Sequence, residues 1–182
     1  MRSEVDPDKL RRLMKALGRS ARGPGRIYLT GGASALLVGW RRSTVAVDIR
    51  LDPEPDGIFE AIARLKNELD VNVELASPQD FMPELPGWRD RSLFIERCGE
   101  VDFFHYDFYA QALSKLSRGH GRDRADVGAM FERGLIDVEG LRGALEATLP
   151  RIIRFPALDA DVLRGRVEVF LKDLEVGDGE GG

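Results

Sequence analysis

The segment that most constrains the fold is a predicted strand that ends in two glycines and passes directly into a helix. Residues 26–30 are typical of a strand, Gly31 and Gly32 interrupt it, and residues 33–38 predict a short apolar helix. Glycines let the backbone approach a bound group closely, and the N–H groups at a helix start favour an anion. Ser34 adds a hydroxyl at the same place. Both a phosphate-binding turn and a plain structural turn fit this pattern.

A second predicted strand follows within a short distance. Residues 43–51 alternate around valines, so one face of the strand is expected in the core. The other face then carries Thr44, Ala46, Asp48 and Arg50. Asp48 is therefore expected as a carboxylate on the central sheet, close to the glycine turn.

Two further acids lie in apolar predicted strands. Glu74 shares one strand face with Asn72 in residues 71–76, and Asp102 lies in residues 101–106. A charged residue in such a strand needs solvent, a partner or a metal ion. If the Glu74 strand lies beside the Asp48 strand, the two carboxylates converge as ligands for Mg²⁺, which prefers oxygen and shares its ligands with phosphates. Asp102 is the alternative third acid, and a solvent-facing position remains the alternative interpretation for each.

The order of elements predicts an α/β (α+β) fold, with a mixed sheet flanked by helices and a helical C-terminal lobe. Helices are expected at 7–18, 33–38, 58–69, 108–116, 123–133, 138–149 and 160–174, a loop at 77–88, and a hairpin from 92–96 and 101–106. The expected divisions are an N-terminal helix (1–25), a sheet domain (26–106), a helical lobe (107–176) and a flexible tail (177–182).

Composition narrows the class of protein. The 182 residues contain no apolar run near the roughly 18 that a membrane span needs, and the charged N-terminus does not resemble a secretion signal. Cys98 is the single cysteine and there are two histidines, so a disulfide scaffold or a zinc cluster is not expected. These features predict a cytoplasmic protein with no membrane partner.

Basic residues are concentrated near the N-terminus. Residues 9–26 contain seven lysines and arginines and no acid, whereas the tail is acidic and glycine-rich. Such a block can contact phosphate, including an RNA acceptor. The solvated face of an amphipathic helix is the favoured interpretation, because charge runs usually mean no more.

The motifs together resemble the nucleotidyltransferase superfamily. The resemblance rests on Gly31-Gly32-Ala33-Ser34, on Arg41-x-x-Thr44 leading to Asp48, and on an acid in a later strand. The sequence is most similar to small bacterial and archaeal members related to the AbiEii and MenT toxins and to the minimal nucleotidyltransferases of toxin–antitoxin pairs. Lys115 and the later run from Arg122 to Asp126 are similar to that group's C-terminal motif, so the resemblance covers about residues 26–133.

The resemblance implies an enzyme that moves a nucleotide from an NTP, with Mg²⁺, onto RNA, such as a tRNA end, or onto a protein hydroxyl. It also implies a cognate antitoxin or toxin as a partner. Asp48 and Glu74 would hold the metal, and Lys115 would approach the phosphates. The implied nucleotide-binding residues are Gly31, Gly32, Ser34, Arg122, Asp123 and Asp126. Lys115 and Arg122 could instead be solvated helix charges.

One position departs from the family pattern. The family carries Asp-x-Asp on the second strand, and here the first acid is replaced by Ala46. Loss of that carboxylate is expected to weaken metal binding and catalysis. Either the chain is a non-catalytic relative, such as an antitoxin or a nucleotide-binding module, or Ala46 is an engineered substitution that silences the enzyme. The otherwise intact strand favours the second explanation.

Overall fold

The computed structural model describes residues 2–179, and the chain divides into two compact units. The first contains the residues up to Ser77 together with Arg89–Tyr106, and the second contains Pro78–Trp88 together with the residues from Asp107 onward. The N-terminal helix, expected as a separate part, therefore belongs to the sheet unit. The segment 78–88 belongs to the helical unit, although it lies between two strands in the sequence.

The first unit is built on the predicted mixed sheet. Its strands are β1 (Gly25–Thr30), β2 (Val47–Leu51), β3 (Val73–Leu75), β4 (Leu93–Cys98) and β5 (Val101–His105). Their order is β3-β2-β1-β5-β4. β1 pairs with β5 and β2 with β3 in parallel, whereas β1–β2 and β4–β5 are antiparallel. The predicted β4–β5 hairpin is confirmed, and Gly99 makes its turn with a φ of +61°.

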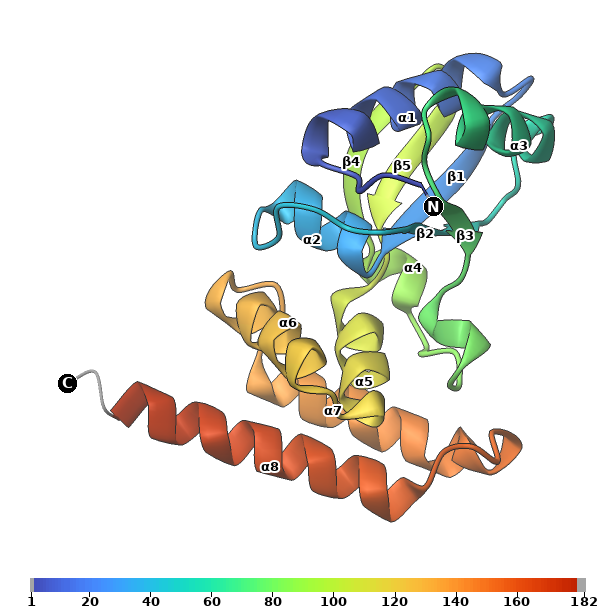
Figure 1. The fold of residues 1–182 in the computed structure, drawn as a ribbon. Helices are drawn as coiled ribbons and strands as arrows, with labels where there is room; N and C mark the ends of the chain where they lie inside the picture. Colours follow the sequence, from blue (N-terminus) through green and yellow to red (C-terminus); the bar gives the residue numbers. More distant parts are fainter. Residues whose placement is uncertain (1, 180–182) are drawn as a thin grey trace. The chain divides into compact units, whose positions relative to one another are not determined.

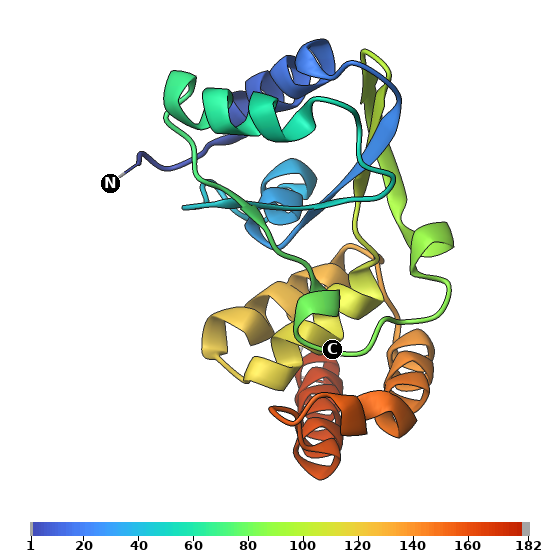
Figure 2. The same ribbon diagram turned by 90° about the vertical axis from the view of Figure 1, so that its right-hand side faces the viewer.

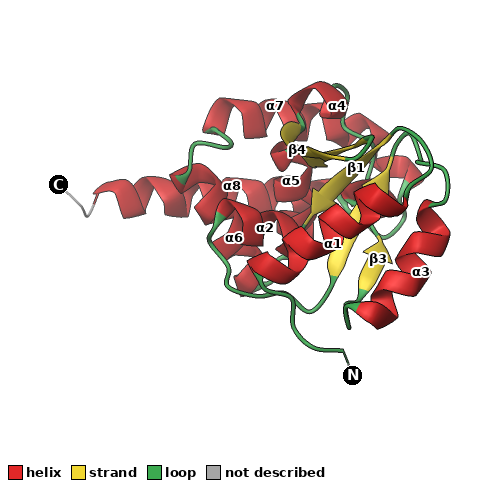
Figure 3. Ribbon diagram, turned by 90° about the horizontal axis from the view of Figure 1, so that it is seen from above, coloured by secondary structure: helices red, strands yellow, loops and turns green. Residues whose placement is uncertain are grey.

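Two helices and the sheet form the main core of this unit. α1 (Pro7–Ser20) begins where the Asp6 carboxylate accepts the Lys9 N–H at 2.8 Å, and Pro7 suits the first helical position. α1 and α3 (Ile58–Glu68) contact each other and bury their apolar faces against β1, β2 and β5 (Figures 1 and 3). α2 (Gly32–Val38) joins the same core through Ala33 and Leu36.

β2 begins later than the sequence predicts. Residue 44 makes an isolated antiparallel bridge with Val5 instead of continuing the strand, with N···O distances of 2.8 and 2.9 Å. Thr44 is consequently buried, while Val45 is 72% exposed, so the expected alternation fails before Val47. The bridge partner lies 39 positions away in the chain, and a local pattern cannot reveal it.

The second unit is helical, as predicted. Its main elements are η1 (Pro78–Asp80), α5 (Phe108–Arg118), α6 (Gly121–Glu132), α7 (Val138–Thr148), η2 (Leu149–Arg154) and α8 (Ala160–Gly179). α5 contacts α6, α7, α8 and η1, so it is the central helix of this unit (Figure 2).

Two expectations in this region need correction. The predicted loop 77–88 contains η1, and its last residue, Trp88, begins the short α4 (Trp88–Arg91). The tail expected from residue 177 is helical as far as Gly179, and residues 180–182 lie outside the described part of the chain. None of the helices within residues 2–179 combines the length and the apolar character that a membrane crossing requires.

Candidate functional site

Asp48 and Glu74 lie directly opposite each other on neighbouring parallel strands. Asp48 of β2 is in register with Thr30 of β1 on one side and with Glu74 of β3 on the other. The predicted adjacency of the two acidic strands is therefore confirmed. Neighbouring strands lie about 4.8 Å apart, which brings both carboxylates within reach of one bound ion. The Asn72 amide donates a hydrogen bond of 2.9 Å to Glu74 Oε1 and so restrains this exposed carboxylate.

The glycine turn lies against Asp48. Gly31 has φ +60° and ψ −130°, a conformation that residues with a Cβ rarely adopt. A Cβ atom placed on Gly31 would lie 3.3 Å from Asp48 Oδ2. A Cβ atom on Gly32 would overlap the Thr44 side chain. Each glycine thus has its own steric reason, and together they place the start of α2 beside the Asp48 carboxylate.

Ala46 lies just before β2 and contributes no ligand atom from its side chain. Its carbonyl accepts a hydrogen bond of 3.2 Å from Thr44 Oγ1, which ties the segment before β2 to the bridge at Val5. Across residues 2–179, no group of three histidine, cysteine, aspartate or glutamate side chains is arranged to hold a metal ion. The protein therefore offers a pair of carboxylates here, Asp48 and Glu74, where the family pattern implies three.

Ser34 takes part in the fold instead of facing solvent. The residue is fully buried, its hydroxyl donates to the Leu29 carbonyl at 3.0 Å, and His105 Nδ1 lies 3.0 Å from the same oxygen. Because the hydroxyl hydrogen goes to Leu29, the consistent arrangement has His105 Nδ1–H donating to Ser34. The expected contact between Ser34 and a triphosphate does not fit this buried position.

Asp102 does not join the acidic pair. It is in register with Arg26 of β1, whereas Asp48 is in register with Thr30, four residues further along the same strand. That offset amounts to about 13 Å along the strand. Asp102 also accepts hydrogen bonds from Arg97 at 2.8 and 3.4 Å. Its expected role as a third metal-binding acid is therefore wrong, and it is an ion-pair partner on the β4–β5 hairpin.

In the second unit, Lys115 is the centre of a buried ion cluster. Its Nζ atom lies 2.8 Å from Asp126 Oδ2 and 3.8 Å from Asp123 Oδ1, and the residue is only 6% exposed. Arg118 also donates to Asp123, at 2.7 Å. The alternative that Lys115 is a solvated helix charge is therefore wrong. Its replacement by alanine would leave Asp126 buried without its counter-ion, and the loss of one partner from such a pair typically costs about 3–5 kcal/mol.

The other basic candidates are mostly surface residues. Arg122 is exposed in the first turn of α6, and Arg124 forms an ion pair with Asp173 of α8. In the N-terminal block, most basic side chains lie on the exposed side of α1, as the solvated-face interpretation predicts. Lys9 is the exception, because it is buried and donates to Ser3 Oγ at 2.7 Å and to the Asp70 carbonyl at 2.6 Å.

The sequence predicted no role for His105. Burial lowers the pKa of His105 to about 4, so the imidazole is neutral at pH 7 and suits the Nδ1–H arrangement with Ser34. A lone histidine in an apolar strand gives no signal that distinguishes this role. The contact that defines the role of His105 is with Ser34, which lies 71 residues earlier in the chain.

The mixed sheet, the glycine turn and the facing strand acids agree with the nucleotidyltransferase class that the motifs predict. A protein-family model described as "Nucleotidyltransferase of unknown function (DUF6036)" matches residues 8–169. The chain therefore belongs to this family, and the superfamily predicted from the motifs is confirmed. No curated protein and no solved structure matches the chain.

Proposed function

We propose that the chain is a nucleotidyltransferase that moves a nucleotide from an NTP, with Mg²⁺, onto an RNA such as a tRNA, or onto a protein hydroxyl. One observation carries the proposal: Asp48 and Glu74 face each other on adjacent strands beside the Gly31 turn. Membership of a nucleotidyltransferase family supports the same chemistry.

The roles follow from the donor set. Mg²⁺ is usually held by one or two carboxylates together with substrate phosphates and water, so the pair Asp48 and Glu74 fits a metal that arrives with the nucleotide. When bound, the ion would neutralise charge on the phosphates as pyrophosphate leaves. Asn72 keeps the Glu74 carboxylate in place through its amide. Gly31 leaves the backbone free of a side chain beside Asp48, where a Cβ would crowd a phosphate, and Gly32 allows Thr44 to pack against the start of α2.

Lys115 is proposed to contribute positive charge toward the phosphates, with Arg122, Asp123 and Asp126 in the same motif. Its ammonium is bound to Asp126 at 2.8 Å, so a phosphate would have to share or replace that partner. This assignment rests on the resemblance of the C-terminal motif, since Lys115 and the acidic pair belong to different units.

A non-catalytic function is the second candidate, as an antitoxin or a nucleotide-binding module. It is favoured by Ala46, because the site lacks the carboxylate that the family pattern places there. Under either candidate, the chain as it stands is expected to bind Mg²⁺–NTP weakly and to turn over poorly. The two candidates differ in what happens when the carboxylate is restored.

Transfer of a labelled nucleotide to total RNA and to protein tests the proposal. Ala46→Asp should raise the transfer rate by about 10²-fold or more, because one preorganised charged group at a reacting phosphate is worth that much. Ala46→Asn introduces a side chain of the size of aspartate without its charge, so it should leave the transfer rate low. The double variant Ala46→Asp with Asp48→Asn should transfer nucleotide only at the background rate.

The outcome also separates the candidates. If Ala46→Asp binds Mg²⁺–NTP by calorimetry but transfers no nucleotide to RNA or protein, the non-catalytic function replaces the enzyme. The proposed place in a toxin–antitoxin pair predicts growth arrest when Ala46→Asp is expressed, and normal growth when Ala46→Asp with Asp48→Asn is expressed.

A further inference from the structure

The exposed side of α1 carries a row of basic side chains. Arg11, Lys15 and Arg19 recur every four residues, and Arg12 falls on the same side of the helix, seven residues before Arg19. Arg11 and Arg19 lie about 12 Å apart along the helix axis, since each helical residue adds about 1.5 Å. All four are exposed, and within residues 2–179 none of their side chains forms a hydrogen bond or an ion pair. We call these four residues the α1 basic face.

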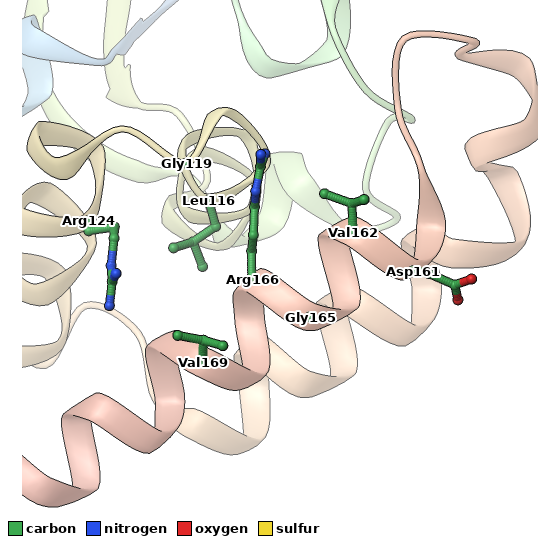
Figure 4. Close-up of a pocket in the computed structure, with 8 residues that line it drawn as sticks. All are labelled: Leu116, Gly119, Arg124, Asp161, Val162, Gly165, Arg166 and Val169. Atoms are coloured by element: carbon green, nitrogen blue, oxygen red, sulfur yellow. The ribbon is translucent and has the colours of Figure 1, made fainter.

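The arginines beside the groove along α8 differ in this respect. Arg124 and Arg166 line that groove (Figure 4). Arg124 pairs with Asp173, and Arg166 donates to the Ser117 carbonyl. Both are therefore already bound within the chain. The α1 basic face, in contrast, presents four positive charges that no described residue pairs, in a chain whose net charge is −4.

The surroundings of the α1 basic face are poor in acids. Residues 9–47 contain nine lysines and arginines and no acid, and Asp8 is the only acid of α1 itself. On the neighbouring α3, Glu68 pairs with Arg64. On the neighbouring β4, Glu96 forms no ion pair with a described residue of α1. The local surface is therefore positive although the chain as a whole is negative, which favours an anionic ligand.

The composition of this surface favours a nucleic acid over a protein. The large apolar residues of α1 all lie in the core: Leu10, Leu13, Met14 and Leu17. A protein partner would find no large apolar side chain on the exposed side of α1, although protein interfaces depend on a desolvated apolar or aromatic centre. Phosphate groups need only positive charge, and the arginine guanidinium matches their geometry. We propose that the α1 basic face binds the phosphate backbone of an RNA acceptor, an inference that rests on the proposed function.

The position of α1 sets a minimum size for this RNA. α1 packs in the same core as Val47 and Ile49, so Asp48, between them, points to the opposite side of the sheet (Figure 3). The exposed side of α1 lies a further helix diameter, about 10–12 Å, behind the sheet. At about 3.4 Å per stacked nucleotide, an RNA that contacts both places needs more than three nucleotides. The α1 basic face therefore fits an extended or folded RNA such as a tRNA, and a trinucleotide cannot reach it from Asp48.

Binding of fluorescein-labelled tRNA, followed by anisotropy, tests the proposal on the chain as it stands. The test variant is Arg11→Gln with Lys15→Gln. Its dissociation constant in about 100 mM salt should rise at least about tenfold, and the slope of log affinity against log salt should become shallower by about 1.4–1.8, because each lost phosphate contact removes about 0.7–0.9. Arg154→Gln with Lys172→Gln is the matched control, since it also removes one exposed arginine and one exposed lysine without an ion pair. The control should bind tRNA as the unsubstituted chain does.

Three results would overturn the proposal. The unsubstituted chain could fail to bind tRNA at about 100 µM in low salt, where even non-specific contacts are measurable. The test and control variants could lose equal affinity, which would show that only the net charge matters. Poly-L-glutamate could displace the tRNA at an equal concentration of charges, which would assign the α1 basic face to an acidic protein.

Kinetics in the Ala46→Asp chain separates this inference from the proposed function. Arg11→Gln with Lys15→Gln should raise KM for tRNA at least about tenfold and leave kcat within about twofold, because it removes binding that is remote from the reacting atoms. The same pair should leave transfer to a trinucleotide unchanged. An unchanged KM for tRNA would overturn the α1 assignment and leave the enzyme in place. If Ala46→Asp transfers no nucleotide but tRNA binding still depends on Arg11 and Lys15, the enzyme fails and the RNA surface stands.

Discussion

At the scale of single residues, His105 has the environment with the clearest consequence for stability. It is partly buried on β5, its pKa is lowered to about 4 by desolvation, and its ring lies 3.0 Å from Ser34 Oγ. The unfolded chain, in contrast, exposes a histidine of ordinary pKa near 6.5. Between these two values the unfolded state binds a proton that the folded state does not. The contribution of neutral His105 to the free energy of unfolding is therefore present above pH 6.5 and is lost as the pH falls toward 4.

The predicted contribution is about 2 kcal/mol between pH 7.5 and 5. His105→Asn retains a donor toward Ser34 and does not titrate. The unfolding free energy of this variant should therefore fall less between pH 7.5 and 5 than that of the unsubstituted chain. Urea unfolding of both chains at several pH values measures the difference, which cancels the shared effect of the carboxylates. Parallel pH dependences for the two chains would show that His105 is accessible to protons in the folded state.

Residue identities predicted the site only in part. Asp48 and Glu74 were identifiable because a carboxylate in an apolar strand is unusual and because their strands could be neighbours. The same argument applied equally to Asp102, and it failed there because the pairing partner that satisfies this acid, Arg97, lies on the other strand of the hairpin. Lys115 was predicted as a site residue, but its burial beside Asp126 of the next helix could not be predicted.

At the scale of elements, a close contact between α1 and the β4–β5 hairpin depends on glycine. A Cβ atom on Gly18 would overlap the backbone of Cys98, and a Cβ atom on Gly99 would approach the Gly18 carbonyl oxygen. Gly143, on the exposed side of α7, has nothing within 4 Å of such an atom. The same substitution is therefore expected to have opposite effects in two helices.

Gly18→Ala should destabilise the protein by about 1–3 kcal/mol, because overpacking outweighs the better helix propensity of alanine. Gly143→Ala should stabilise it by about 0.5–1 kcal/mol, because only the propensity changes. Urea unfolding followed by circular dichroism measures both. A stabilising effect of Gly18→Ala would mean that the hairpin moves away from α1 at little cost.

Most elements could be predicted because their patterns are local. The apolar period of α1 and α3, the hairpin at Gly99 and the helices from residue 108 onward each follow from short stretches of sequence. The start of β2 did not follow from the local sequence, because the bridge between Val5 and Thr44 removes residues 43–46 from the strand. Segment 78–88 was expected as a loop, and its three prolines did not indicate that η1 packs on α5.

At the scale of the whole molecule, the helical unit is discontinuous in sequence. Residues 78–88 supply it with η1 and with the buried side chains of Met82 and Leu85. In the same unit, Arg151 donates to the Glu84 carbonyl at 3.4 Å. The helices after residue 107 therefore do not constitute the complete folding unit.

A fragment of residues 107–182 is expected to melt at a lower temperature, and less cooperatively, than a fragment of residues 78–182 in which a glycine–serine linker replaces residues 89–106. The longer fragment keeps η1 and the apolar contacts of residues 78–88. Thermal unfolding followed by circular dichroism compares the two. Equal melting temperatures would show that residues 78–88 are dispensable for the helical unit.

The bridge between Val5 and Thr44 has a practical consequence for how the protein is produced. Thr44 also lies against Gly32 at the start of α2, so the bridge connects the segment around Val5 to the candidate site. An affinity tag fused at the N-terminus would be attached within a few residues of that contact. Purification through an N-terminal tag should therefore include its removal before nucleotide binding is measured, so that the tag does not disturb the segment that positions Asp48.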